Sequence, residues 1–178
     1  MSGIIGVSPD MRSGVVGAWP SGHVVQVVYG ETDSQASVTD GNITFTSATV
    51  VRKLASSIFH VRANIMYAVT TTTADASNPG FGFYYNGSLV TQATAIGNSG
   101  TINDGFYFSD LPSFGSGSYD TRQISCGCKV TDTGTVGDSE AISIIGGVDS
   151  GNTLYRNRST NQSISGGIST ITVMEVQP

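Results

Sequence analysis

One segment of the chain places an apolar residue at every second position, and it restricts the fold more than any other feature. It runs from Ile58 to Val69, and the positions between the apolar set include His60, Arg62 and Asn64. Successive side chains of a β-strand point to opposite faces of a sheet, so a period of two predicts one long strand. One face of this strand is expected in the core, and the other is mixed. The apolar set comprises Phe59, Val61, Ala63, Ile65, Tyr67 and Val69.

Shorter strands are predicted on both sides of this segment. Residues 23–29 (HVVQVVY) are apolar on both faces, which is typical of a central strand buried between two layers. Asp40-Gly41 is expected to form a tight hairpin turn, and Asn86-Gly87 a second one, because glycine and asparagine tolerate positive φ. Further strands are predicted at residues 124–130, 141–148, 154–156 and 170–176.

The composition agrees with strands and turns and disfavours helices. Ser, Thr and Gly together make up more than a third of the chain, and charged residues only 12%. Long helices need Ala, Leu, Glu, Lys and Arg on their exposed faces, whereas this composition is typical of all-β proteins with many turns. We therefore predict an all-β fold: a single antiparallel β-sandwich or jelly roll over residues 21–178, preceded by an extended N-terminal arm over residues 1–20.

Charge and hydropathy argue against two classes of partner. The formal net charge is -5, whereas a nucleic-acid-binding surface needs clustered Lys and Arg to bind phosphates. No window approaches the roughly 18 uncharged apolar residues of a membrane span. The first residues also lack the basic and apolar regions of a secretory signal. We expect neither nucleic acid nor a membrane as partner, and we expect the chain to be made and kept soluble in a cytoplasm.

The sequence offers no catalytic or metal-binding constellation. A nucleophile needs a base beside it, and the only two histidines, His23 and His60, both lie in predicted strands. Most acidic residues, among them Asp132, adjoin Gly, Ser or Thr in expected turns, where Asp caps its own backbone. We therefore expect no enzymatic activity, no metal and no cofactor.

The two cysteines, Cys126 and Cys128, stand two positions apart in a predicted strand. They share a face with Ile124 and Val130, so both are expected in the core as free thiols. Two thiols supply only half of a zinc site, and no second pair of ligands completes it.

Two segments are candidates for contact with other molecules. The arm is rich in apolar residues with only two charges, so it gains by burial against its own domain or another subunit. A polar loop over residues 98–117 carries aromatic residues that either hold a ligand or pack in the core or a trimer contact. The arm residues are Ile4, Ile5, Val7, Val15, Val16 and Trp19, and the loop residues are Phe106, Tyr107, Phe108 and Phe114.

Four phrases, in their order along the chain, carry a resemblance to a family of virion proteins. They are MSGIIGVSPDMRSGVVGAWPSGHVVQVV, SIFHVRANIMYAV, LYRNRST and STITVMEVQP. In these phrases the chain resembles the small β-sandwich proteins that tailed bacteriophages use as capsid decorations, head fibres and tail-fibre tips. The resemblance covers about a third of the chain and leaves residues 70–117 unassigned. It implies a jelly roll similar to tumour-necrosis-factor and complement-C1q heads, assembled as a homotrimer and incorporated into a virion.

Two functions of different classes follow from this resemblance. The first is a capsid decoration or cement protein, a trimer whose arm docks on the major capsid protein. The second is a tail-fibre tip whose loops bind a glycan of the host surface. The two share a fold, so the fold does not separate them. Fibre chains usually carry a long shaft before the head, and here about 20 residues precede the domain, which favours the decoration protein.

Overall fold

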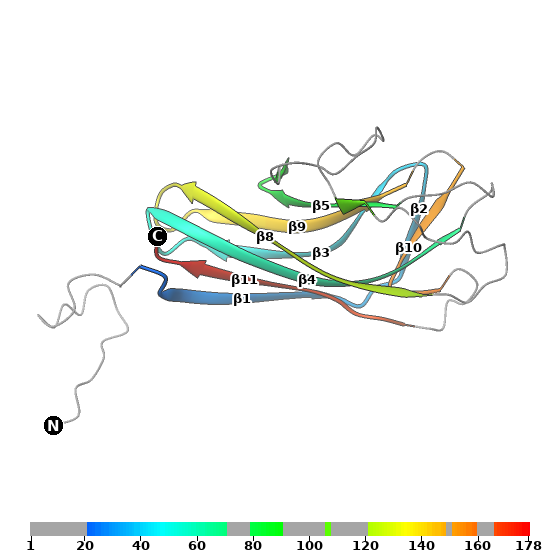
Figure 1. The fold of residues 1–178 in the computed structure, drawn as a ribbon, viewed down its shortest axis with the longest axis horizontal. Coiled ribbons are helices and arrows are strands. Elements are labelled where there is room, and N and C mark those ends of the chain that lie inside the picture. Colours follow the sequence, from blue (N-terminus) through cyan, green and yellow to red (C-terminus); the bar gives the residue numbers. More distant parts are fainter. Residues whose placement is uncertain (1–20, 71–78, 91–105, 108–120, 149–150, 160–165) are drawn as a thin grey trace, which may run out of the picture.

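The computed structural model of the chain describes residues 21–70, 79–90, 106–107, 121–148, 151–159 and 166–178. Within these ranges the chain forms eleven strands and no helix, arranged as two antiparallel sheets (Figure 1). The strands are β1 (Val24–Thr32), β2 (Ala36–Thr39), β3 (Asn42–Val51), β4 (Ser56–Thr70), β5 (Gly80–Tyr85), β6 (Ser88–Leu89), β7 (Phe106–Tyr107), β8 (Arg122–Thr133), β9 (Ser139–Gly147), β10 (Thr153–Arg156) and β11 (Ser169–Val176). The predicted all-β sandwich is confirmed, and the predicted arm lies outside the described residues.

The long strands alternate between the two sheets along the chain, which gives the sandwich a jelly-roll order. In the first sheet, called sheet A, β1 pairs with β11, β11 pairs with β4, and β8 pairs with the other side of β4. Strands β10 and β2 extend sheet A at the far end of β4. In the second sheet, called sheet B, the order is β3-β9-β5, and the short strands β6 and β7 both pair with β5. The first and last strands are therefore neighbours, as in a jelly roll.

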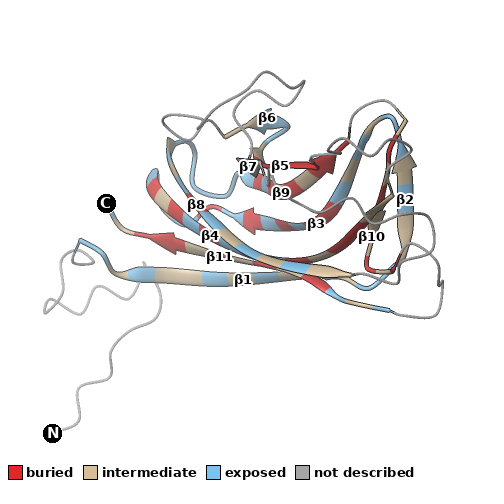
Figure 2. Cartoon of the chain, turned by 45° about the vertical axis from the view of Figure 1, so that its right-hand side comes forward, coloured by how far each residue is buried: buried red, intermediate tan, exposed pale blue. Residues whose placement is uncertain are grey.

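The core lies between the sheets, and alternate residues of β4 supply much of it. Phe59, Val61, Ala63, Ile65 and Tyr67 are each at most 2% exposed, as the period of two predicts. The alternation of buried and exposed positions can be followed along the strands of sheet A in Figure 2. The long predicted strand is confirmed, and it extends a little beyond the predicted segment at both ends.

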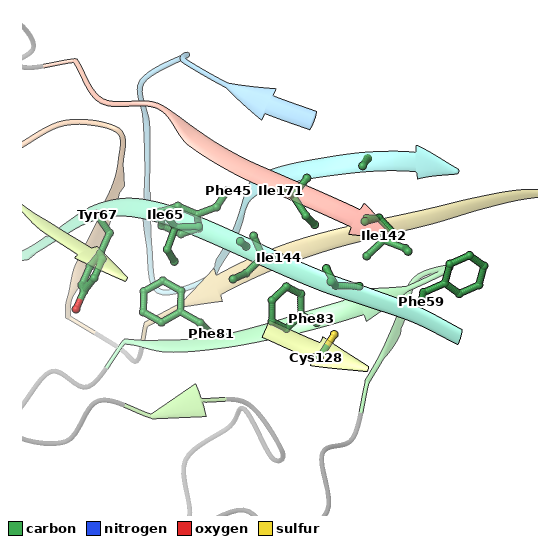
Figure 3. Close-up of a cluster of buried hydrophobic side chains, with 14 of the residues drawn as sticks. Phe45, Phe59, Ile65, Tyr67, Phe81, Phe83, Cys128, Ile142, Ile144 and Ile171 are labelled. Atoms are coloured by element: carbon green, nitrogen blue, oxygen red, sulfur yellow. The ribbon is translucent and has the colours of Figure 1, made fainter. Parts of the chain in front are cut away.

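Aromatic rings from both sheets meet within the core (Figure 3). Phe45 of β3 and Tyr67 of β4 both contact Phe81 of β5 edge to face, with ring centroids 5.5 and 5.0 Å apart. Gly146 of β9 makes room for these rings, since a Cβ there would lie within 2.8 Å of Phe81. Edge-to-face pairs stabilise a core by about 0.5–1.5 kcal/mol beyond the burial of area, so this cluster helps to fix how the sheets stack.

Two tight turns form where they are predicted, but only one of them closes a hairpin. Asn86 and Gly87 have φ angles of 49° and 81° and join β5 to β6, as a type I′ turn does. Asp40 also has a positive φ of 54°, but β2 and β3 on either side of it belong to different sheets. The predicted hairpin at Asp40-Gly41 is therefore wrong, and the turn carries the chain from sheet A to sheet B.

Strand β1 contradicts the prediction of a central, doubly covered strand. It lies at the edge of sheet A, and Val27 and Tyr29 are 58% and 57% exposed. The strand also packs beside β3 of sheet B, where a Cβ on Gly30 would overlap the carbonyl oxygen of Ser47. The prediction failed because a strand with apolar residues on both faces can leave its outer face uncovered within its own chain, as β1 does.

The four C-terminal strands lie close to their predicted positions. Strands β8, β10 and β11 contain the predicted segments 124–130, 154–156 and 170–176, and β9 ends one residue before the predicted 148. β8 shows the predicted half-buried pattern, with alternating exposed and covered residues.

Different strands lie at the two ends of the sandwich. The Gly22 N–H donates to the Gln177 carbonyl (2.8 Å), and the Gln177 N–H donates to the His23 carbonyl (2.9 Å). The start of β1 and the C-terminus therefore lie together at one end of the sandwich (Figure 1), which we call the arm end because the described chain begins there, directly after the predicted arm. β2 and β10 lie at the opposite end (Figure 1).

Candidate functional site

A buried arginine connects the two sheets at the arm end. Arg52 directly follows β3, and its side chain has no exposed area. Its Nε donates to Glu140 of β9 (2.8 Å), and its Nη2 donates to the Tyr85 hydroxyl (2.9 Å) and to the Asp132 carboxylate of β8. The guanidinium carbon also lies 5.3 Å from the centre of the Phe59 ring. These contacts engage the guanidinium within the protein, so this arginine cluster joins the sheets rather than binding a ligand.

The environment of the arginine cluster shifts the pKa values of Glu140 and Tyr85. Burial on its own would raise the pKa of Glu140, but hydrogen bonds from Asn86 and Arg52 lower it. The pKa of the Tyr85 hydroxyl is raised, first by burial and then by its interactions with Asp132 and Glu140. At neutral pH Glu140 is therefore ionised and Tyr85 is neutral. Arg52 and Glu140 therefore form a buried ion pair, and neither Glu140 nor Tyr85 is poised to exchange a proton near neutral pH.

Asp132 corrects the sequence prediction that placed it in a turn. It lies in β8, and its carboxylate accepts a hydrogen bond from the Tyr85 hydroxyl (2.6 Å) as well as from Arg52. Its threonine neighbours in the sequence, Thr131 and Thr133, are exposed strand residues. A Thr-Asp-Thr sequence therefore reads equally well as the exposed end of a strand.

A third carboxylate at this end, that of Glu175 of β11, is fully buried. It accepts hydrogen bonds from the Ser57 hydroxyl (2.6 Å) and from the backbone N–H groups of Lys53 and Leu54 (3.1 Å each). The Gln26 amide also donates to it (2.5 Å). Through its hydrogen bonds to Lys53 and Leu54, Glu175 fastens the segment between β3 and β4 to sheet A. Together with the arginine cluster it stiffens the arm end.

The two cysteines are free thiols on the inner face of β8. Cys128 is buried in the core, as predicted, and Cys126 is half-buried and packs against the core. Burial raises the pKa of Cys126 to about 11 and that of Cys128 to about 12. The thiolate is the nucleophile and the metal ligand, so neither cysteine is suited to these roles near neutral pH.

The outer face of sheet A carries a cluster of basic side chains around a hollow of about 390 Å³. His60 and Arg62 of β4 and Lys129 of β8 are exposed there. The strand register places His60 opposite Lys129, and Arg62 opposite Gly127. The four positions form a square in which one corner has no side chain. We call this feature, made of His60, Arg62, Gly127 and Lys129, the basic notch.

Gly127 cannot be replaced by a larger residue without a change in the pairing of β4 and β8. A Cβ at this position would lie 2.8 Å from the carbonyl oxygen of Val61, which is closer than real Cβ contacts. The empty corner of the basic notch therefore follows from the close approach of these two strands.

A second surface feature lies along β1. Val24, Val27 and Tyr29 are 43%, 58% and 57% exposed, and we call these three residues the β1 apolar row. Met174 of β11 lies between Val27 and His60 in the register, so the row is separated from the basic notch by one strand. Adjacent exposed apolar side chains are typical of a surface that contacts another molecule.

The residues predicted to make external contacts lie largely outside the described part of the chain. Of the loop aromatics, Phe106 and Tyr107 form β7, which pairs with Gly80 and Phe81 at the edge of sheet B. The other two, Phe108 and Phe114, lie outside the described residues, as do the arm residues Ile4, Ile5, Val7, Val15, Val16 and Trp19. Their contacts stay predictions.

Sequence reasoning missed both the arginine cluster and the basic notch. Arg52 stands 80 and 88 positions from its two carboxylate partners, so no local spacing marks the cluster. The alternation placed His60 and Arg62 on the mixed face of one strand. Pairing that strand with residues 124–130 in the correct register would have been needed to bring Lys129 beside them.

Comparisons with models of known protein families and with curated proteins found no match. Within the described ranges, no group of three or more His, Cys, Asp or Glu side chains is arranged to hold a metal ion. The same residues include no helix that is long and apolar enough to span a membrane. The β1 apolar row and the basic notch are therefore the features from which a function can be argued.

Proposed function

We propose that the chain is a structural virion protein of a tailed bacteriophage: a trimeric capsid decoration protein that docks on the major capsid protein through residues 1–20. The observation that carries this proposal is the β1 apolar row, which leaves large apolar side chains exposed on an edge strand. The jelly-roll order of the strands also agrees with the family that the sequence resembles. The proposal assigns the protein no catalytic activity, metal or cofactor.

The β1 apolar row supports assembly with further copies of the chain. Burying one aliphatic side chain removes it from water at a gain of roughly 1.5–3 kcal/mol. Val24, Val27 and Tyr29 are about half exposed, so contact between this row and another copy would recover part of that gain for the two valines and cover the Tyr29 ring. An interface between two different surfaces of the same chain closes into a ring when the rotation between copies is one third of a turn.

The arm end supports docking on one surface. In a threefold trimer equivalent ends point the same way along the axis, so three copies of residues 1–20 leave toward one side. Ordering a residue costs about 1–2 kcal/mol, and a few apolar anchors offset that cost only narrowly for one arm. Three arms bind with avidity, which converts a marginal contact into a durable one. The buried Arg52 and Glu175 clusters give the arms a stiff base.

Removing the arm tests its role in docking. A variant that lacks residues 1–18 is expected to remain a folded trimer that no longer binds undecorated capsids of its own virus. A full-length variant with Ile4, Ile5 and Val7 changed to Ser should show the same loss. As a matched control, Asp10→Asn with Arg12→Gln keeps the apolar anchors and should bind normally. Full occupancy of the capsid by the truncated trimer would contradict the docking role.

The alternative is a tail-fibre tip that binds a glycan of the host surface. The basic notch favours it, because a hollow with unpaired polar groups on an exposed face suits a small ligand. The two functions differ in their target. A decoration protein binds undecorated capsids of its own virus, whereas a fibre tip leaves those capsids unbound and binds only intact host cells.

A further inference from the structure

The basic notch concentrates positive charge on a chain whose formal net charge is -5. His60, Arg62 and Lys129 are all exposed, and within the described residues none of them forms an ion pair. Arg52, in contrast, has both of its carboxylate partners inside the protein. The Arg62 and Lys129 cations, held close together, repel each other, and an anion between them relieves that repulsion. The notch therefore has the charge expected of a site that binds an anion.

The spacing of a β-sheet brings the three basic residues within reach of one small group. Paired residues on neighbouring strands are about 5 Å apart, and diagonal neighbours about 7–8 Å. His60 and Lys129 are directly paired, and Arg62 is diagonal to Lys129 because it pairs with Gly127. A carboxylate above the bare backbone of Gly127 would lie beside Arg62 and Lys129. His60 is diagonal to that position.

The surroundings of the notch offer contacts beyond those that an inorganic anion would use. Met174 lines the hollow and pairs with His60, and Thr172 pairs with Arg62. On the next row of the same face, the Ser125 hydroxyl donates to the Asn64 side chain. A thioether packs against ring carbons, whereas hydroxyl and amide groups hydrogen-bond to sugar hydroxyls.

We propose that the basic notch binds the carboxylate of an acidic saccharide. The planar guanidinium of Arg62 forms paired hydrogen bonds with a carboxylate, and the Lys129 ammonium adds a third charge-assisted bond. The sugar ring lies against Met174, and its hydroxyl groups meet the rim at Thr172 and Asn64. Occupancy of the notch does not depend on the capsid role, because it requires only that the outer face of β4 and β8 stays open to solvent in the assembled protein.

Titration of the full chain with matched trisaccharides, followed by NMR shifts or calorimetry at low salt, tests this assignment. The acidic probe is a trimer of galacturonic acid, and the neutral probe is a trimer of galactose. Binding of the acidic probe and not the neutral one is expected. Arg62→Gln and Lys129→Gln should each weaken it by about fivefold or more, since each loses a charge-assisted hydrogen bond. Lys53→Gln removes the same charge from an exposed position outside the notch and should leave affinity unchanged.

Three results would overturn the assignment. One is no binding of the acidic trisaccharide by the natural chain. Another is equal weakening by Lys53→Gln and Lys129→Gln, which would mean that overall charge and not the notch attracts the ligand. The third is equally tight binding of inorganic sulfate or of a triglutamate peptide, which would identify a plain anion site or a peptide site. Unchanged thermal unfolding of the variants shows that any loss of binding is local.

Discussion

Arg52 is the residue on which the junction of the two sheets at the arm end depends. Replacing it with Met leaves Glu140 and Asp132 without the cation that lies between them. Removing one partner of a buried ion pair costs about 3 kcal/mol or more, because the remaining charge stays away from water. We expect Arg52→Met to lower the free energy of unfolding by about that amount in urea titrations at one protein concentration.

The exposed Arg62 provides the control for this substitution. Arg62→Met removes the same charge from the surface and should change the free energy of unfolding by less than about 0.5 kcal/mol. Equal stability of Arg52→Met and Arg62→Met would show that the arginine cluster adds nothing to the fold.

The lowered pKa of Glu140 predicts that the folded chain loses stability in acid. Its pKa lies below the ordinary value of about 4.5 in the folded chain, so the unfolded chain takes up the proton first as the pH falls. The contribution of Glu140 to the free energy of unfolding is complete above its pKa in the unfolded chain. It is lost as the pH falls through its pKa in the folded chain. The melting temperature should therefore drop below about pH 4.5, and Glu140→Gln should have a flatter acid limb. Parallel acid limbs in a melting series from pH 7 to pH 3 would assign the acid sensitivity elsewhere.

Strands could be predicted from the sequence where one face packs on a core and the other meets solvent. β4 and β8 fit this condition, and their alternation gave their inner faces, although β8 runs from Arg122 to Thr133 and is longer than the predicted 124–130. β1 did not fit it, because its exposed apolar residues carry the same pattern as buried ones. The turn at Asp40 could be predicted from its residues. Which sheet each flanking strand joins depends on pairing partners far along the chain, and so does the assembly of the basic notch.

The two cysteines of β8 should react slowly with a thiol reagent in the native protein. Their pKa values of about 11 and about 12 leave almost no thiolate at pH 8, and Cys128 is buried. Denaturant should raise the rate of labelling by Ellman's reagent sharply. In a Cys128→Ser variant the half-buried Cys126 should react faster than Cys128 does in Cys126→Ser. Rapid native labelling of Cys128 would mean that β8 does not cover the core as described.

At the scale of the whole molecule, the β1 apolar row predicts the oligomeric state. Light scattering of the natural chain should give three times the 18.4 kDa mass of one copy across a dilution series. Val27→Lys with Tyr29→Lys places two unpaired charges in the proposed contact and should yield monomers. Asn42→Lys with Thr49→Lys adds the same charge at exposed positions of β3 and should leave the trimer intact. A natural chain that is monomeric at micromolar concentration would contradict trimer formation.

The central claim concerns where the molecule sits, and electron microscopy of the intact virus particle measures that most directly. The account predicts threefold jelly-roll density on the outer surface of the head shell. The arm end, with Gly22 and Gln177, should face the major capsid protein. In particles lacking the protein this density should be absent and the shell otherwise complete. Density of this shape at the tip of a tail fibre, with none on the head, would contradict the decoration role and establish the alternative.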